Sequence, residues 1–303
     1  MAPSEHVRYE VEGGRARIIL DRPEKRNAVT GEMSRAIHDL LWEADDDTSV
    51  HSIIIKGRGP SFCAGADLSR YRMEDDRPDP SRRSLTSTID DDIWQIERGQ
   101  RANIAPFDVH KPVIAQVQGH CLALGTVIAL FCDFVICADD ARFGFPPARD
   151  LGTPPSSMWL YHVGPQWAKR LTMTGDTITG QEAAALGLAL KSVPPGDLER
   201  EVEQLADRLA LIDHHLLAAN KRIINLGLEL MGARTLQRLS AEIDGRAHLA
   251  PGTAEYTRRV TTLGWREGIR ARDAAFGDGR ARVQGPERRD ARGYLLDEDA
   301  RDD

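Results

Sequence analysis

The stretch VIAQVQGHCLALGTVIAL, residues 113–130, combines a short apolar strand, a turn of small residues and a second apolar run, without a formal charge. The stretch IIIKGRGPSFCAGADL, residues 53–68, has the same order of strand, small-residue turn and expected helix. Such turns leave backbone N–H groups free at a helix start. Two converging turns could hold one oxygen atom between two N–H donors, as an oxyanion hole does. Turns rich in glycine and alanine are also common structural devices, so the pattern alone leaves both interpretations open.

Hydrophobic patterning predicts that strands and helices alternate up to residue 150, which favours an α/β layer architecture. Thr30 is the expected N-cap of the first helix, because a threonine hydroxyl can accept a bond from a free helix amide. The expected strands are 7–11, 15–20, 51–57, 111–119 and 134–138, and the expected helices are 31–45, 88–105 and 124–131, with a loop at 119–123.

After residue 155 the pattern becomes mostly helical. The expected helices are 156–173, 180–187, 197–212, 214–230, 233–249 and 253–275. The last 27 residues carry fourteen charges and few large apolar side chains. A segment of this composition at a chain end is expected to be disordered, so we predict a disordered tail at 277–303.

Composition bears on the class of partner. The formal net charge of −7 argues against a general nucleic-acid binder, which normally has a basic excess. The uncharged run 113–132 is long enough to cross a bilayer. Gln116, Gln118 and Gly119 interrupt it, however, and Asp133 follows it directly, so no membrane segment is expected.

The four cysteines show neither a CxxC pair nor a Cys/His spacing typical of a metal site. Three of them lie within apolar runs, which predicts buried free thiols. Free thiols are typical of a reducing compartment, so we expect a cytoplasmic protein without a metal centre.

Four segments, in order along the chain, resemble the crotonase family, the enoyl-CoA hydratase/isomerase superfamily. They are DRPEKRNAVT at 21–30, FCAGADLSR at 62–70, AQVQGHCLALG at 115–125 and RLTMTGDTITGQEAAALGLALKSVP at 170–194. The resemblance implies an α/β spiral of ββα turns, followed by a helical C-terminal region that forms a homotrimer and commonly a hexamer of two trimers. Residues 1–195 would be the acyl-CoA-binding core, 196–276 the oligomerisation region and 277–303 the tail.

The same resemblance implies an acyl-CoA thioester as ligand, with coenzyme A entering as part of the substrate and no separate cofactor. Carried over by position, the backbone N–H of Ala66 is the first oxyanion donor and that of Leu124 the second. The family usually has glycine at the second position. The pair would bind the thioester carbonyl and stabilise an enolate, and losing one such donor typically costs ~10²–10³-fold in rate.

The expected coenzyme A contacts come from two segments. They are Lys25, Arg26 and Ala28, and Ala64, Ala66, Asp67, Leu68 and Ser69. The two cationic side chains could meet phosphate oxygens. A solvated surface loop is the competing interpretation for either of them alone.

Two positions depart from the family pattern. Members that add water to enoyl-CoA use two glutamates, and this chain has Val127 and Pro147 at the corresponding positions. A positioned acid or base is typically worth ~10²–10⁴-fold in rate. Ordinary hydration should therefore be nearly abolished.

Three residues are candidate replacements for the missing acid and base. Asp150 follows Pro147 in a loop one residue longer than the family's, and it is otherwise a loop cap. Ser156 aligns with a catalytic acid of some relatives, although a helix N-cap is the competing role. His120 has a near-neutral reference pKa, but a histidine in such a turn is often structural.

Two functions follow from these observations. The first is an enzyme that forms an enolate from an acyl-CoA and then isomerises, hydrolyses or cleaves it. The alternative is a catalytically silent protein of the same fold that binds acyl-CoA or serves as an assembly scaffold.

Overall fold

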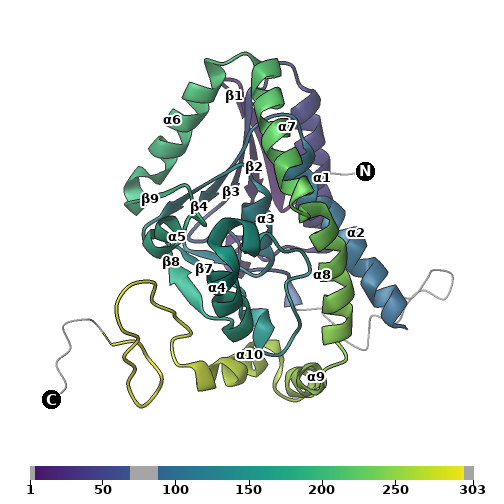
Figure 1. Ribbon diagram of the computed structural model, residues 1–303, viewed down its shortest axis with the longest axis vertical. Helices are drawn as coiled ribbons and strands as arrows, with labels where there is room; N and C mark the ends of the chain where they lie inside the picture. Colours follow the sequence, from purple (N-terminus) through teal and green to yellow (C-terminus); the bar gives the residue numbers. More distant parts are fainter. Residues whose placement is uncertain (1–3, 69–87, 297–303) are drawn as a thin grey trace.

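The computed structural model describes residues 4–68 and 88–296, and its strands form two sheets surrounded by helices (Figure 1). The strands are β1 Val7–Glu12, β2 Arg15–Leu20, β3 Ser52–Gly57, β4 Val113–Val117, β5 His120–Leu122, β6 Phe134–Ala138, β7 Arg142–Gly144, β8 Thr177–Thr179 and β9 Lys191–Val193. The larger sheet has the order β1-β2-β3-β4-β6-β9 and the smaller β5-β7-β8. β1 and β2 are an antiparallel hairpin, and the later neighbours in the larger sheet are parallel.

Helices follow most of the strands, and after β9 the described chain is mainly helical. They are α1 Gly31–Asp46, α2 Ile89–Asp108, α3 Leu124–Phe131, α4 Trp159–Thr174, α5 Gly180–Leu186, α6 Leu198–Ala210, α7 His214–Leu230, α8 Ala233–Ala247, α9 Pro251–Leu263 and α10 Trp265–Asp273, with 3-10 turns η1 Pro23–Lys25, η3 Pro146–Arg149, η4 Pro195–Asp197 and η5 Ala274–Phe276. The predicted N-cap of α1 is confirmed, because Oγ1 of Thr30 accepts the Met33 amide at 3.2 Å.

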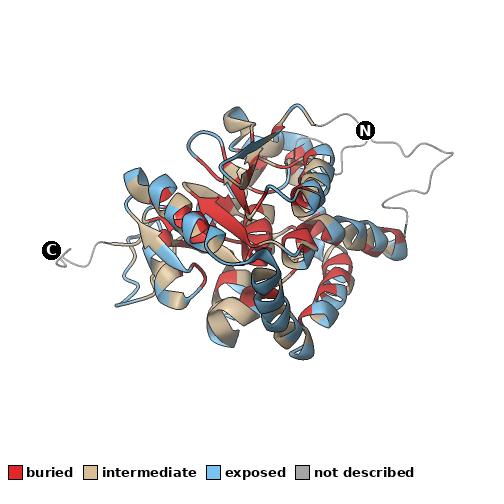
Figure 2. Ribbon diagram, turned by 90° about the horizontal axis from the view of Figure 1, so that it is seen from above, coloured by how far each residue is buried: buried red, intermediate tan, exposed pale blue. Residues whose placement is uncertain are grey.

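The core lies along the parallel strands. Ile53, Ile54 and Ile55 are all fully buried, so β3 is covered on both faces, as expected for an interior parallel strand. Figure 2 shows the buried strands at the centre of the molecule and the exposed faces of the helices around them. This sheet fixes the positions of the two turns that follow β3 and β4.

The C-terminal helices form the other part of the molecule. α7 and α8 follow one another along one side, α8 packs along α2, and α9 packs against α10 (Figure 1). The predicted single helix 253–275 is wrong, because Gly264 has φ of +77° and ψ of 157° and separates α9 from α10. A glycine adopts this conformation without the clash that a Cβ would cause.

Four short strands differ from the sequence prediction. β5 lies in the segment expected to be a loop at 119–123, and β7, β8 and β9 were not expected at all. Each has three residues, which is too short to show the alternation of apolar and polar residues on which strand prediction depends. They form because neighbours distant in sequence pair with them, as Cys121 does with Phe143.

The tail predicted to be disordered is ordered over residues 277–296. Ala281 is fully buried, and the Thr177 amide of β8 donates to the Gly279 carbonyl at 2.7 Å. The charges that suggested a solvated tail partly pair with one another, as Arg289 and Asp278 do at 3.4 Å. The last seven residues lie outside the described chain.

Candidate active site

The turns after β3 and β4 converge. A β-bridge pairs the backbones of Cys63 and Cys121, with the Cys63 amide donating to the His120 carbonyl at 2.8 Å. Gly65, with φ of +119°, approaches the other turn so closely that an added Cβ would lie 3.0 Å from Cβ of Ala123. The two segments singled out in the sequence therefore form one site.

The backbone segments around Ala66 pair with each other without a hydrogen bond from the Ala66 amide. The Val29 amide donates to the Gly65 carbonyl at 2.8 Å, and the Asp67 amide donates to the Val29 carbonyl at 2.9 Å. This pairing uses the Gly65 carbonyl and the Asp67 amide, on either side of Ala66, and leaves the Ala66 amide without a hydrogen bond to any described residue.

The Leu124 amide is free for a different reason. Leu124 is the first residue of α3, and the first amides of a helix have no intrahelical acceptor. No hydrogen bond from this amide to a residue of the described chain is formed. Ala123, one residue before Leu124, takes a positive φ of +51°. Such backbone strain, of about 1–3 kcal/mol, is commonly found at functional sites.

The two amides belong to residues that line a single cavity of about 660 Å³, a size typical of small-molecule sites. The residues predicted from the sequence that line it are Lys25, Arg26, Ala28, Ala64, Ala66, Asp67, Leu68, His120 and Leu124. Pro147 also lines it, whereas Asp150 and Ser156 do not, and Ser69 lies outside the described residues.

The loop from Arg22 to Ala28 is held in shape by a buried asparagine. Oδ1 of Asn27 accepts the Arg22 amide at 2.8 Å, and its Nδ2 donates to the carbonyls of Arg58 and Ser61. Asn27 has a positive φ of +55°, a conformation that asparagine tolerates better than most residues. Its role is therefore to position the cationic loop beside the cavity.

Three cations line the cavity without a carboxylate partner. Lys25, Arg26 and Arg266 form no ion pair with any residue in the part of the chain that the structure describes. Nζ of Lys25 lies 5.5 Å from the ring centre of Trp265 on α10. The sequence prediction included the first two, and α10 adds the third.

His120 lies on β5 in the cavity wall. Its Nδ1 is 3.2 Å from Oγ of Ser61, and its Nε2 is 3.5 Å from Nη1 of Arg26. Burial first, then the positive charges of Arg26 and Arg142, lower the pKa of His120. The imidazole is therefore a neutral hydrogen-bonding group near physiological pH.

A family model for enoyl-CoA hydratase/isomerase matches residues 10–244. The chain belongs to the enoyl-CoA hydratase/isomerase family. This membership confirms the resemblance to the crotonase superfamily seen in the sequence.

Two curated relatives and one solved structure illustrate the similarity. The hydroxycinnamoyl-CoA hydratase-lyase of Pseudomonas fluorescens is 32% identical over 243 residues, 78% of this chain and 84% of that protein. The 2,3-dehydroadipyl-CoA hydratase of Escherichia coli strain K12 is 31% identical over 258 residues, 84% of this chain and 90% of that protein. An enoyl-CoA hydratase crystal structure from Mycobacterium smegmatis has a TM-score of 0.82 at 35% identity, covering 91% of this chain and 95% of that one. The expected α/β crotonase-type fold with a helical C-terminal region is confirmed.

In this member of the hydratase/isomerase family, Asp150 is occupied by ion pairs. Its Oδ2 is 2.8 Å from Nη1 of Arg259, and its Oδ1 is 3.3 Å from Nη1 of Arg272. Both carboxylate oxygens therefore contact guanidinium groups of the C-terminal helices. The loop cap that was the competing role does not describe Asp150 either, because its carboxylate ties η3 to α9 and α10.

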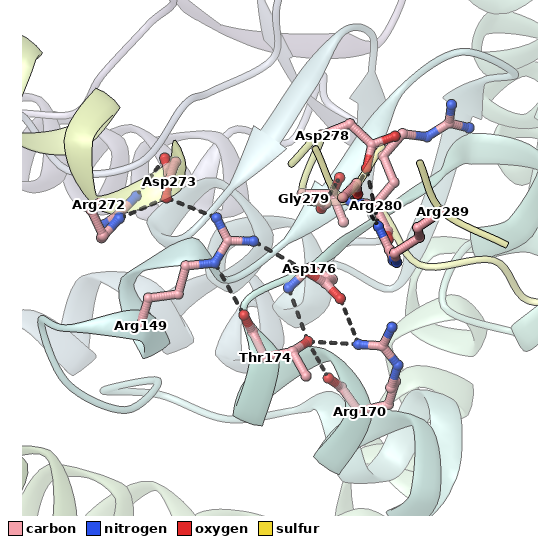
Figure 3. Close-up of polar contacts among 12 residues, drawn as sticks. Arg149, Arg170, Thr174, Asp176, Arg272, Asp273, Asp278, Gly279, Arg280 and Arg289 are labelled. Atoms are coloured by element: carbon pink, nitrogen blue, oxygen red, sulfur yellow. Dashed lines mark hydrogen bonds and ion pairs between the residues drawn. The ribbon is translucent and has the colours of Figure 1, made fainter. Parts of the chain in front are cut away.

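The neighbouring arginine also points into the C-terminal region. Arg149 is 3.1 Å from Asp176 and 2.7 Å from Asp273, and Figure 3 shows its guanidinium between the two carboxylates. The same guanidinium lies 4.0 Å from the centre of the Phe276 ring. Arg149 thus anchors η3 to α10 and to the segment after it.

Ser156 is buried but is not a helix cap. α4 begins at Trp159, three residues later than predicted, with Met158 at the N-cap position. Oγ of Ser156 has no hydrogen-bond partner among the described residues. Neither the catalytic role nor the N-cap role of Ser156 has a contact that supports it.

A carboxylate and a histidine that were not predicted line the cavity from the end of α8. Oδ1 of Asp244 accepts the Thr153 amide at 2.7 Å and lies 3.7 Å from Nε2 of His248. Nδ1 of His248 lies 2.6 Å from Oδ2 of Asp92 on α2. Burial raises the pKa of Asp244 to about 6. The i,i+4 spacing of Asp244 and His248 was visible in the sequence, but nothing there placed α8 at the cavity.

The four cysteines are free and buried, as predicted. Burial raises the pKa of Cys63 to about 12 and that of Cys137 to about 12. Thiols of this kind are poor nucleophiles near neutral pH. They therefore contribute to packing.

Residues 4–68 and 88–296 lack two other kinds of feature. No group of three or more histidine, cysteine, aspartate or glutamate side chains in these ranges has an arrangement that could hold a metal ion. None of the helices in these ranges is both long and apolar enough to cross a membrane.

Proposed function

We propose that this protein is an enzyme acting on an acyl-CoA thioester, whose carbonyl oxygen binds between the amides of Ala66 and Leu124. One observation carries the proposal: two amides from separate turns, neither bonded to a described residue, belong to residues that line the same cavity. The relatives named above, which act on CoA thioesters according to their names, support the substrate class.

The chemistry would proceed through an enolate. When a proton leaves the carbon next to the thioester carbonyl, the electron pair of that C–H bond enters a new C=C bond and negative charge moves to the oxygen. Two amides placed before the reaction stabilise this charge without reorganising. Isomerisation, hydrolysis and C–C cleavage can each continue from the same intermediate.

Coenzyme A would bind as part of the substrate, with no separate cofactor. The cations Lys25, Arg26 and Arg266 supply positive charge on the cavity wall for its phosphates. The backbone of the 64–68 segment, which bonds to the cationic loop through the Ala64 amide and the Arg26 carbonyl at 2.9 Å, would hold the rest of the carrier.

Ordinary two-glutamate hydration is not the reaction that we propose. Val127 is buried in the apolar helix α3, and Pro147 lies in η3 at the cavity wall. Neither side chain can exchange a proton. A different acid–base group must therefore serve the enolate.

We further propose that the protein is a cytoplasmic homotrimer or hexamer. Leu216, Ile223 and Leu230 are spaced by seven along α7, and are 59%, 65% and 91% exposed. A stripe of this kind is typical of a helix face that another subunit covers. The free, buried cysteines support the proposed cytoplasmic location.

The test is an assay of purified protein with crotonyl-CoA, a hydroxycinnamoyl-CoA and 2,3-dehydroadipyl-CoA, together with affinity measurements for each. We expect turnover or exchange of the α-hydrogen for deuterium with at least one thioester, and slow hydration of crotonyl-CoA. Binding without turnover or exchange would favour the scaffold alternative. Hydration of crotonyl-CoA at family rates would contradict the claim about Val127 and Pro147.

A further inference from the structure

We propose that Asp244 is the proton-transfer group of this site, with His248 and Asp92 as its positioning residues. The inference rests on the proposed enolate chemistry and names the group that the departures at Val127 and Pro147 leave open. Asp244 lines the same cavity as Ala66 and Leu124.

Asp244 meets the loop that follows Pro147. Its Oδ1 accepts the Thr153 amide at 2.7 Å, so the carboxylate is fixed against the loop beyond the family's second glutamate position. Gly152 makes this approach possible, because a Cβ there would lie 2.4 Å from the same oxygen. The longer loop therefore makes room for a carboxylate delivered by α8.

His248 and Asp92 hold this carboxylate from the other side. Nδ1 of His248 is 2.6 Å from Oδ2 of Asp92, so the Asp92 carboxylate orients the imidazole ring. Nε2 of the same ring lies 3.7 Å from Oδ1 of Asp244, within ion-pair distance. His248, Asp244 and Asp92 lie at the contact between α8 and α2, and His248 and Asp244 also line the cavity.

The charges acting on Asp244 can be named. His248 lies on the same helical stretch and Asp92 comes from α2, while the loop contributes Thr153, which has no charge. Burial is the largest influence and raises the Asp244 pKa to about 6, and Asp92 raises it further, whereas His248 and Thr153 lower it. A carboxylate with a pKa near the working pH is suited to accept and return a proton.

The proton balance is simple. Oδ of ionised Asp244 takes the α-hydrogen as a proton, the C–H electron pair forms the enolate C=C bond, and the charge rests on the thioester oxygen between Ala66 and Leu124. The neutral carboxyl group then returns a proton to carbon. In D2O the returned proton exchanges with solvent, so the thioester gains deuterium.

The experiment measures deuterium uptake at the α-carbon of butyryl-CoA and of the panel thioesters by mass spectrometry. We expect Asp244→Asn to lose exchange by at least ~10²-fold while its affinity for the thioester changes less than threefold, and Asp244→Glu to recover part of the rate. The matched control is Asp45→Asn, because Asp45 is also a buried carboxylate bonded to a histidine and an amide, and it does not line the cavity.

The positioning residues are tested by the pH profile of exchange in the wild type. Exchange should fall as pH drops through about 6, because Asp244 gains its proton there. Asp92→Asn removes a negative charge that raises the Asp244 pKa, so the fall in exchange at acidic pH should move to lower pH. His248→Gln removes an influence that lowers this pKa, so the fall should move to higher pH. If Asp92 and His248 had only a structural role, their variants would exchange more slowly, but the pH at which exchange falls would not change.

Three outcomes decide the question. Loss of exchange in Asp244→Asn alone, with the fall in exchange at acidic pH shifted in the other two variants, supports the assignment. Exchange at the wild-type rate in folded Asp244→Asn overturns it and leaves the proposed function intact. If the wild-type protein exchanges no deuterium into any of the thioesters, both the proposed function and the role of Asp244 are overturned.

Discussion

At the scale of single residues, the proposed chemistry uses two backbone amides and one buried carboxylate. In the proposed mechanism Ala66 and Leu124 would contribute only backbone N–H groups, so their side chains should matter little to the chemistry. Asp244 would contribute its carboxylate. Burial raises the pKa of this group, which suits proton transfer but lowers the stability of the folded chain at neutral pH. Only a substitution that removes the backbone N–H should disable Ala66 or Leu124, whereas a change of side chain alone should disable Asp244.

Replacing Ala66 with proline removes one N–H donor and should reduce α-deuterium exchange by ~10²–10³-fold. Ala66→Gly keeps the amide and is the control, with exchange expected within a few-fold of the wild type. Circular dichroism and thermal unfolding would establish that both variants fold. Exchange surviving in a folded Ala66→Pro protein would show that this amide does not bind the oxygen.

The buried carboxylate should cost stability at neutral pH. The pKa of Asp244 is raised from 3.8 to about 6 in the folded chain, so the unfolded state loses this proton first and stability falls as pH rises from about 4 to about 6. Asp244→Asn cannot ionise and should therefore be more stable than the wild type above pH 6, by up to about 3 kcal/mol. The difference should shrink toward pH 4.

Urea unfolding of the two proteins at pH 4, 6 and 8 measures this difference. A constant difference across the three pH values would contradict the raised pKa. A variant that gains stability while losing exchange would place Asp244 among residues kept for activity at a cost in stability.

At the scale of elements, α7 is tied to the core by one buried cation. Nζ of Lys221 lies 2.8 Å from Oδ2 of Asp133 and donates to the carbonyl of Pro106 at 2.7 Å. Removing one partner leaves an uncompensated buried charge, so Lys221→Ala should cost about 3–5 kcal/mol in the free energy of unfolding.

The control for this change is Lys191→Ala, which breaks a more exposed pair with Glu201. It should cost less than about 1 kcal/mol. Guanidinium unfolding curves give both values. Equal costs would mean that the Lys221 pair contributes no more than a surface contact.

Much of this element pattern was predictable from the sequence. The turns after β3 and β4 were visible because small residues separate apolar runs there, and α3 and β6 have the predicted bounds. Thr30 marked the start of α1 by local chemistry alone. These features depend on neighbours in the sequence.

The parts that were missed depend on distant contacts. Asp92 and His248 are 156 positions apart, and they meet only because α8 packs along α2. Asp150 was a candidate base because its loop is one residue longer, but the arginines that engage it come from α9 and α10. No local pattern carries that information.

At the scale of the whole molecule, the exposed apolar stripe of α7 calls for an explanation. Substituting Ile223 and Leu230, which are 65% and 91% exposed, with lysine should convert the proposed trimer or hexamer into smaller species. Light scattering after gel filtration measures the mass. Met173→Lys on α4, at a side chain 75% exposed, is the control and should leave the mass unchanged. A wild-type protein that is already monomeric would contradict the oligomer.

The central claim is that the amides of Ala66 and Leu124 polarise a thioester carbonyl. Infrared difference spectroscopy with a carbonyl-¹³C acyl-CoA tests this most directly, because the C=O stretching frequency falls as hydrogen bonds to its oxygen strengthen. We expect a lower frequency for the bound thioester than for the same thioester in water, and loss of this shift in Ala66→Pro with ligand still bound. An unchanged frequency in the wild-type complex would contradict the claim.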